Sequence, residues 1–180
     1  MKFVQTSLEG AFLVEMEPLR DERGCFMRTF CRREFEHRGL ESDFVQHSMS
    51  RSNRRGTLRG MHFQRLPHEE VKIVRCLRGV IWDVLLDLRA DSPTFAKWQG
   101  FELHGESATE LYVPKGFAHG FQALTDDVEV SYLISTEYAP GFAEGVRFDD
   151  RKFGITWPIP VTTISDKDRA WPDFGRDGGC

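Results

Sequence analysis

The residues best suited to chemistry lie between Arg54 and Lys72, in the stretch RRGTLRGMHFQRLPHEEVK. His62 can accept a proton near neutral pH, and Lys72 supplies a positive charge that could stabilise the anion left behind. Far downstream, Tyr132 adds a hydroxyl that can donate a proton. We predict that these side chains share a proton-transfer site inside a β-rich barrel, and that the rest of the chain is mainly scaffold.

The spacing of apolar residues predicts that these three side chains point inward. Alternate residues of a strand share a face, which places Lys72 with Val74, Tyr132 with Val130, and His62 on the side of small or apolar neighbours. Each residue also has a simpler interpretation: a hydrogen-bonded core histidine, a lysine reaching to water, and a packed tyrosine. Their occurrence together favours a site.

Other polar residues have weaker signals. Arg54, Arg55 and Arg59 crowd the strand that carries His62, either as a solvated face or as a group that binds phosphate. His119 follows a Pro-x-Gly turn and is by itself more typical of a structural residue. Asp168 belongs to a charged turn that solvation alone would explain, unless the turn contacts His62.

Many short runs of β-forming residues, separated by turn signals, predict an all-β sandwich or barrel. A short helix is expected at Arg33 to Leu40, and a tight hairpin at Arg78-Gly79 between the runs KIVRCL and VIWDVLLDL. The segment PKGFAHG is expected to be a loop. The Pro-rich last forty residues are expected to wrap the barrel, in a single domain spanning 1–180 with a mobile end at 175–180.

Composition excludes several classes of function. The net charge of −4 argues against the broad positive field of a nucleic-acid-binding protein. Neither a signal peptide nor an apolar run long enough for a membrane span is visible, so a cytoplasmic protein is expected. Four scattered cysteines are then expected to be free thiols. The sequence has no His-x-His pair of the kind that would suggest a metal site. No metal or other cofactor is therefore expected.

Five segments carry a resemblance to a known family. They are RGTLRGMHFQ (55–64), KIVRCLRGVIWDVLLDLR (72–89), SPTFAKWQGFEL (92–103), VPKGFAHGF (113–121) and SDKD (165–168). In this order and spacing they resemble the dTDP-4-dehydrorhamnose 3,5-epimerase family. The resemblance implies a cupin-like jelly roll, a homodimer without metal, and an isomerase that epimerises nucleotide-linked 4-keto-6-deoxy sugars.

The resemblance also implies roles for individual residues. His62 would be the base with Asp168 as its carboxylate partner, Tyr132 the acid, and Lys72 the group beside the keto oxygen. The residues implied to bind substrate are Arg59 and His119 at the diphosphate, Arg23 and Gln46 at the nucleotide, and Tyr138 near the base or sugar.

Some features depart from the family pattern or from simple geometry. Arg28, Ser48 and the segment HEEVK replace residues more usual in the family, which leaves the nucleotide and the number of epimerised carbons open. Strict alternation puts Arg59 and His62 on opposite faces, so a bulge or strong twist at Gly60 is required if both face the site.

Three alternatives stay open at this point. One is a C3-only or C5-only epimerase of another nucleotide sugar, such as a CDP-sugar. The second is a metal-dependent cupin enzyme. The third is a binding module for sugar nucleotides that performs no proton exchange.

Overall fold

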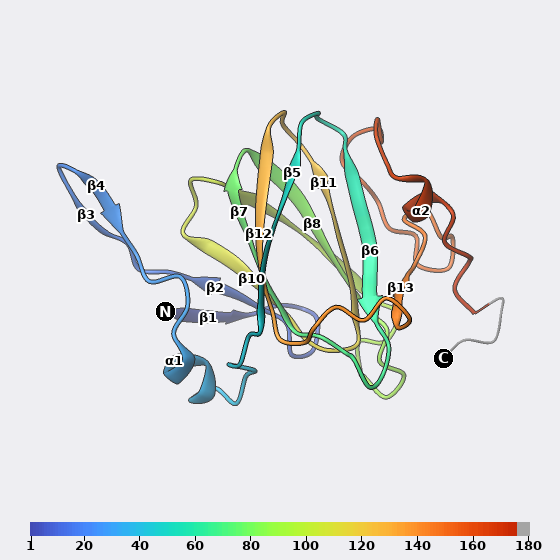
Figure 1. Ribbon diagram of the computed structural model, residues 1–180, viewed down its shortest axis with the longest axis horizontal. Coiled ribbons are helices and arrows are strands. Elements are labelled where there is room, and N and C mark those ends of the chain that lie inside the picture. The colour runs from blue at the N-terminus through green and yellow to red at the C-terminus, as the bar shows by residue number, and fades with distance from the viewer. Residues whose placement is uncertain (176–180) are drawn as a thin grey trace.

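The computed structural model describes residues 1–175 and shows two β-sheets packed face to face (Figure 1). The six-stranded sheet has the order β1 (Lys2–Gln5), β2 (Phe12–Glu15), β10 (Thr109–Val113), β7 (Lys72–Arg78), β12 (Val128–Ile134) and β5 (Gln46–Ser52). The five-stranded sheet has the order β13 (Ala143–Gly145), β6 (Leu58–Gln64), β11 (Phe117–Ala123), β8 (Val80–Asp87) and β9 (Trp98–His104). The predicted all-β jelly-roll sandwich is confirmed, with open sheets in place of a closed barrel.

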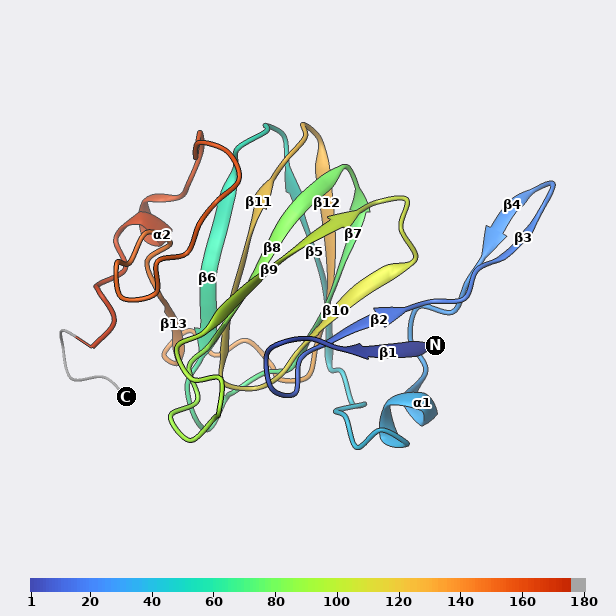
Figure 2. The same ribbon diagram turned by 180° about the vertical axis from the view of Figure 1, so that it is seen from behind.

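A two-stranded hairpin and two short helices complete the secondary structure of residues 1–175. The strands β3 (Leu19–Asp21) and β4 (Gly24–Phe26) form a hairpin that projects from the body of the molecule, and Figure 2 shows the same projection from behind. Helix α1 (Arg32–Glu36) coincides with the start of the helix predicted at Arg33 to Leu40. Helix α2 (Asp166–Arg169) lies beside β6.

Apolar side chains gather in three layers. The layer between the sheets includes Val74 and Val130 from one sheet and Leu85 and Phe121 from the other. The outer face of the five-stranded sheet is covered by the C-terminal segment, whose Phe153 packs there, so the predicted wrapping tail is confirmed. Helix α1 covers part of the outer face of the six-stranded sheet. The central layer therefore fixes the two sheets whose inner faces carry the candidate residues.

Two predictions about connections are wrong. The turn at Arg78-Gly79 is not a hairpin, because β7 pairs with β10 and β12 while β8 pairs with β9 and β11. Gly79, with a φ of +77°, instead turns the chain from one sheet into the other. The segment PKGFAHG is not wholly a loop either, because strand β11 begins at Phe117 and contains His119.

Other expectations concern the thiols, the chain end and membrane spans. Cys25, Cys31 and Cys76 are free, as expected. The predicted mobile end falls largely on 176–180 and, like Cys180, lies outside the described residues. Within residues 1–175, no helix has the length and apolar character needed to cross a membrane.

Candidate active site

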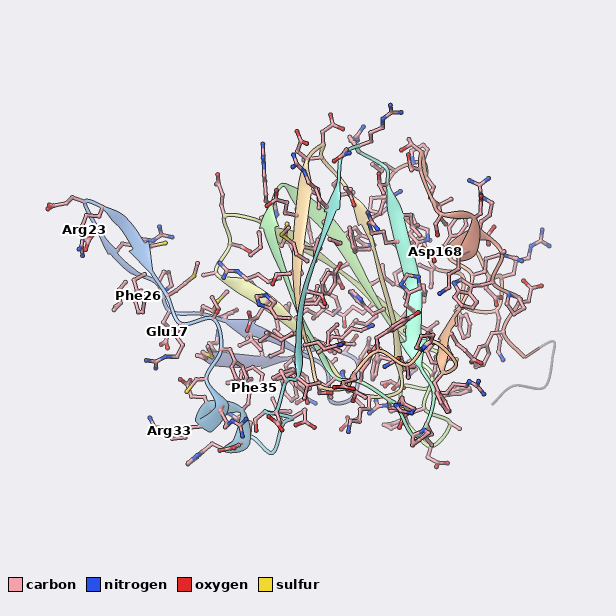
Figure 3. The ribbon with its side chains drawn as sticks, viewed as in Figure 1. Glu17, Arg23, Phe26, Arg33, Phe35 and Asp168 are labelled. Atoms are coloured by element: carbon pink, nitrogen blue, oxygen red, sulfur yellow. The ribbon has the colours of Figure 1, made fainter. Side chains whose placement is uncertain are left out.

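A cavity of about 490 Å³ opens between the two sheets and collects the main candidate residues. His62 comes from β6, His119 from β11, Lys72 from β7 and Tyr132 from β12, and Asp168 reaches the cavity from α2. Figure 3 shows Asp168 beside β6, in the segment that packs on that side of the sandwich. Residues far apart in the sequence therefore line one cavity.

Strand alternation explains why Lys72 and Tyr132 face inward. On β7, Lys72 shares its face with Val74 and Cys76, which pack in the layer between the sheets. On β12, Tyr132 shares its face with Val130 in the same layer. Because the apolar neighbours fix the register of both strands, Lys72 and Tyr132 must also point to the inner face, at the open end of that layer.

The predicted irregularity in β6 is present. His62 pairs with His119 and Arg59 pairs with the residue two positions further along β11, so three steps on β6 correspond to two on β11. This bulge lets Arg59 and His62 both line the cavity. Gly60, with a φ of +134°, lies at the bulge, and a Cβ there would sit 2.5 Å from the Cα of Gly120. Glycine is thus required for the close approach that turns both side chains inward.

His62 and Asp168 form a hydrogen-bonded pair. The distance from His62 Nε2 to Asp168 Oδ1 is 2.7 Å, and the backbone amide of Gly60 donates to Asp168 Oδ2 at 3.3 Å. Burial by itself would raise the pKa of Asp168, but the hydrogen bond and charge of His62 hold that pKa below its usual value. The ionised carboxylate accepts a hydrogen bond from Nε2–H, which leaves Nδ1 of His62 as the nitrogen that can accept a proton.

The contact of Asp168 with His62 depends on how α2 begins. Ser165 caps the helix, since its side chain accepts a hydrogen bond from the backbone amide of Asp168 at 3.1 Å. This cap orients the first turn and its carboxylate toward β6. The charged turn is therefore more than a solvated surface feature.

His119 forms a second pair, with Asp83 of β8. Its Nε2 lies 3.0 Å from both carboxylate oxygens, and the two side chains are 5% and 0% exposed. The ring of His119 also meets the ring of Tyr132 edge-on, with centroids 6.3 Å apart. His119 lines the cavity but is anchored from behind.

Tyr132 is held by a hydrogen bond between its hydroxyl and Ser50 Oγ at 2.9 Å. Burial raises the pKa of Tyr132, while the bond to Ser50 and the charge of Arg59 act in the opposite direction. Arg59 itself donates to Ser52 Oγ and to the backbone carbonyl of Arg51. Tyr132 is therefore a protonated hydroxyl at neutral pH, with partners that would stabilise it after loss of a proton.

Lys72 lies against Glu70, with 2.7 Å between Nζ and Oε1, and each side chain is 12% exposed. The cation at the cavity wall is therefore paired and largely shielded from water. Arg54 and Arg55 do not line the cavity, and Arg55 is bound instead to Asp126 and to the carbonyl of Leu124.

Three predicted binding residues do not line the cavity. Arg23 sits on the projecting hairpin, where it is exposed and paired with Asp21 (Figure 3). Gln46 begins β5 opposite Ile134, and Tyr138 is 58% exposed in the loop after β12. Their expected contacts with nucleotide stay predictions.

The candidate metal ligands do not converge. Over residues 1–175, no group of three or more His, Cys, Asp or Glu side chains is placed to hold a metal ion. His62 and His119 are each engaged by a separate aspartate. The donor set of the cavity thus does not fit the metal site of the alternative cupin enzyme.

Sequence reasoning did not identify four residues that hold the site together: Ser50, Gln64, Glu70 and Asp83. Asp83 had a visible signal, because a carboxylate in the middle of an apolar strand needs a buried partner. Glu70 had one too, since it lies two residues before Lys72. Nothing in the local sequence of Ser50 or Gln64 reveals their partners.

Comparison with known proteins shows the family to which this chain belongs. A sequence profile of the dTDP-4-dehydrorhamnose 3,5-epimerase family matches residues 5–176. A protein of that name from Methanothermobacter thermautotrophicus is 46% identical over 173 residues, covering 94% of this chain and 92% of its relative.

Solved structures give the same result. The dTDP-4-dehydrorhamnose 3,5-epimerase of Elizabethkingia anophelis is similar with a TM-score of 0.93 and 40% identity, covering 97% of this chain and 96% of that one. The Bacillus anthracis enzyme of the same name, solved with TDP and PPi bound, has a TM-score of 0.92 and 38% identity, over 95% and 98% of the two chains. The chain described here belongs to the dTDP-4-dehydrorhamnose 3,5-epimerase family of isomerases.

Proposed function

We propose that this protein epimerises C3 and C5 of a dTDP-linked 4-keto-6-deoxyhexose, with dTDP-4-keto-6-deoxyglucose as the substrate. The observation that carries the proposal is the His62–Asp168 pair at 2.7 Å, in a cavity that also presents Lys72 and Tyr132. Family membership supports the substrate class. These groups provide a base, a cation and an acid, as removal and return of a proton beside a ketone require.

The first step is removal of a proton from a carbon next to the C4 ketone. His62 accepts it at Nδ1, and Asp168 stabilises the imidazolium that forms. The C–H bonding pair moves into the ring and the carbonyl oxygen becomes an enolate. Lys72 is the cation that stabilises this oxygen, which makes the proton removable at neutral pH.

The second step returns a proton to the opposite face of the same carbon. Tyr132 donates its hydroxyl proton, the enolate collapses to the ketone, and the configuration is inverted. The imidazolium then releases its proton to water and the phenolate takes one from water, so the protein returns to its starting state. No electrons leave the sugar, and the cycle repeats at the other carbon beside C4.

The charges near the cavity suit the diphosphate. We assign diphosphate binding to Arg59 and His119, both of which line the cavity. Arg23, Gln46 and Tyr138 would contact the nucleotide only after the chain meets a second copy. The exposed Leu19 and Phe26 on the projecting hairpin, 72% and 70% exposed, support a homodimer in which the hairpin packs on the partner. A cytoplasmic location is part of the proposal, and the free thiols of Cys25, Cys31 and Cys76 fit the reducing conditions there.

Solvent exchange tests the proposal directly. The protein is incubated in D₂O with the dTDP-linked 4-keto-6-deoxyglucose and, separately, with its CDP-linked counterpart, and NMR reads deuterium at C3 and C5. We expect deuterium at both carbons of the dTDP-linked sugar. Exchange at one carbon would reduce the proposal to a single-position epimerase. If neither the dTDP-linked nor the CDP-linked sugar exchanged at either carbon, the proposal would be overturned.

A further inference from the structure

Glu70 occupies a position from which it can control Lys72. Its Oε1 lies 2.7 Å from Lys72 Nζ, and both side chains are 12% exposed. A lysine side chain has four rotatable bonds and a compact charge, so by itself it would not hold one place at a cavity wall. The carboxylate removes that freedom and supplies the counter-charge for a cation placed among apolar neighbours.

Glu70 is fixed in turn by Gln64, which is 3% exposed at the end of β6. The amide nitrogen of Gln64 donates to Glu70 Oε2 at 3.0 Å and to the carbonyl oxygen of His68 at 3.1 Å. Its amide oxygen accepts a hydrogen bond from the backbone amide of Ala139 at 2.7 Å. Gln64 therefore ties the segment that leads into β7 to the loop that follows β12.

Backbone contacts strengthen the same connection. The amide of Val71 donates to Ser135 Oγ at 2.8 Å, and Thr136 Oγ1 donates to the carbonyl of Glu69 at 2.9 Å. The backbone on both sides of Glu70 is thus anchored to 135–139. A carboxylate on such a support has little freedom to move away from its cation.

We propose that Glu70, clamped by Gln64, is the positioning residue for Lys72, and that it places the ammonium group where the enolate oxygen forms. This inference rests on the proposed function and deepens it. Glu70 acts through Lys72 and touches no reacting atom. Its removal would lower the rate of the chemical step and leave substrate binding almost unchanged, because a keto oxygen needs the cation far less than an enolate does.

The first experiment measures the position of Lys72 without using catalysis. Purified protein is treated with limiting acetic anhydride, and mass spectrometry follows acetylation of Lys72 against Lys115, which is 49% exposed, as internal reference. In Glu70→Gln we expect Lys72 to react at least fivefold faster, since the amine is released from its partner. Glu102→Gln, which removes an exposed carboxylate paired with His104 on β9, is the matched control and should change nothing. An unchanged rate for Lys72 in Glu70→Gln would overturn the proposal whatever the enzyme catalyses.

The second experiment measures coupling in the reaction. Deuterium exchange at saturating dTDP-linked substrate is compared for the wild type, Glu70→Gln, Lys72→Met and the double variant. Glu70→Gln should lower kcat about tenfold with KM and dTDP affinity within twofold, and should add no loss in the Lys72→Met background. Glu70→Asp keeps the charge on a shorter side chain and should lose less than Glu70→Gln. An equal loss from Glu70→Gln in both backgrounds would show a merely structural role and contradict the proposal, as would an unchanged kcat.

Discussion

Two histidines that line the cavity are each paired with an aspartate, and the two pairs differ mainly in the exposure of the histidine. His62 and His119 are register partners on the neighbouring strands β6 and β11, and each Nε2 lies within 3.0 Å of an aspartate. The side chain of His62 is 43% exposed, whereas that of His119 is 5% exposed and its Asp83 is fully buried. The same two residue types are therefore placed in two environments, side by side.

This difference teaches how the chain divides two tasks. A base must exchange its proton with substrate and water, so it needs an open ring and a partner that stabilises its charged form. A group that binds a diphosphate must hold its place, and a ring pinned by both oxygens of a buried carboxylate does so. We assign proton transfer to His62 and binding to His119 on these grounds.

A large effect is expected from removing Asp168, the carboxylate partner of His62. Asp168→Asn should lower kcat for exchange by about 10²-fold or more, because the amide no longer fixes the tautomer of His62 or stabilises its charged form. Steady-state exchange rates at saturating substrate measure this. Asp83→Asn is the matched change in the buried pair, and should lower Tm more than Asp168→Asn while costing less in kcat. If the two variants lost kcat equally, the division of tasks would be wrong.

A smaller effect is expected when the proposed acid is removed. Tyr132→Phe should keep deuterium exchange within about tenfold of the wild type but reduce net epimerisation more strongly, because His62 can still remove a proton and return one on the same face. NMR separates the two by following deuterium content and product configuration in one sample. Equal losses in exchange and in epimerisation would argue against Tyr132 as the acid for the second face.

The buried histidine should affect binding more than chemistry. His119→Asn should weaken the affinity for dTDP by about tenfold, the cost of one charge-assisted hydrogen bond, with kcat reduced less than KM is raised. Calorimetric titration with dTDP gives the affinity, and saturation kinetics give the split. A normal affinity joined to a large fall in kcat would make His119 part of the proton-transfer chemistry.

Glu110 shows how burial changes the pKa of a carboxylate that is not paired with a histidine. It is 3% exposed, and its Oε1 has no hydrogen-bond partner among the described residues. Burial raises the pKa of Glu110 to about 8, although the charge of Arg75 partly opposes this. Between the ordinary glutamate pKa, near 4.5, and pH 8, the folded state keeps a proton that the unfolded state releases, so stability falls as pH rises through this window.

Glu110→Gln should therefore raise Tm at pH 8.5 by several degrees, and should change it little at pH 4.5. Thermal melts at the two pH values measure the difference. The same shift in Tm at both values would mean that proton release from Glu110 does not limit stability.

Periodicity predicted the inner faces of the strands well, because alternation depends only on local backbone geometry. Lys72 and Tyr132 face the cavity for this reason, and the bulge at Gly60 could be inferred from the need to turn Arg59 and His62 the same way. The turn at Gly79 was misassigned because a hairpin and a crossing between sheets have the same local sequence signal.

Contacts between distant segments could not be predicted from local sequence. Asp168 lies 106 residues from His62, and their pairing depends on how the C-terminal segment packs over β6. The resemblance to a family suggested this pair, whereas it did not suggest the support of Lys72 by Glu70 and Gln64. Residues that position another side chain, as Glu70 and Gln64 do, follow no periodicity or motif that a single sequence would reveal.

The most direct test of the central claim is deuterium exchange in matched variants of the two histidines. His62→Ala and His119→Ala are incubated in D₂O with saturating dTDP-4-keto-6-deoxyglucose, and deuterium at C3 and C5 is followed by NMR. We predict that His62→Ala abolishes exchange at both carbons while His119→Ala, once saturated, retains it. Exchange at the wild-type rate in His62→Ala, or its complete loss in saturated His119→Ala, would contradict the account.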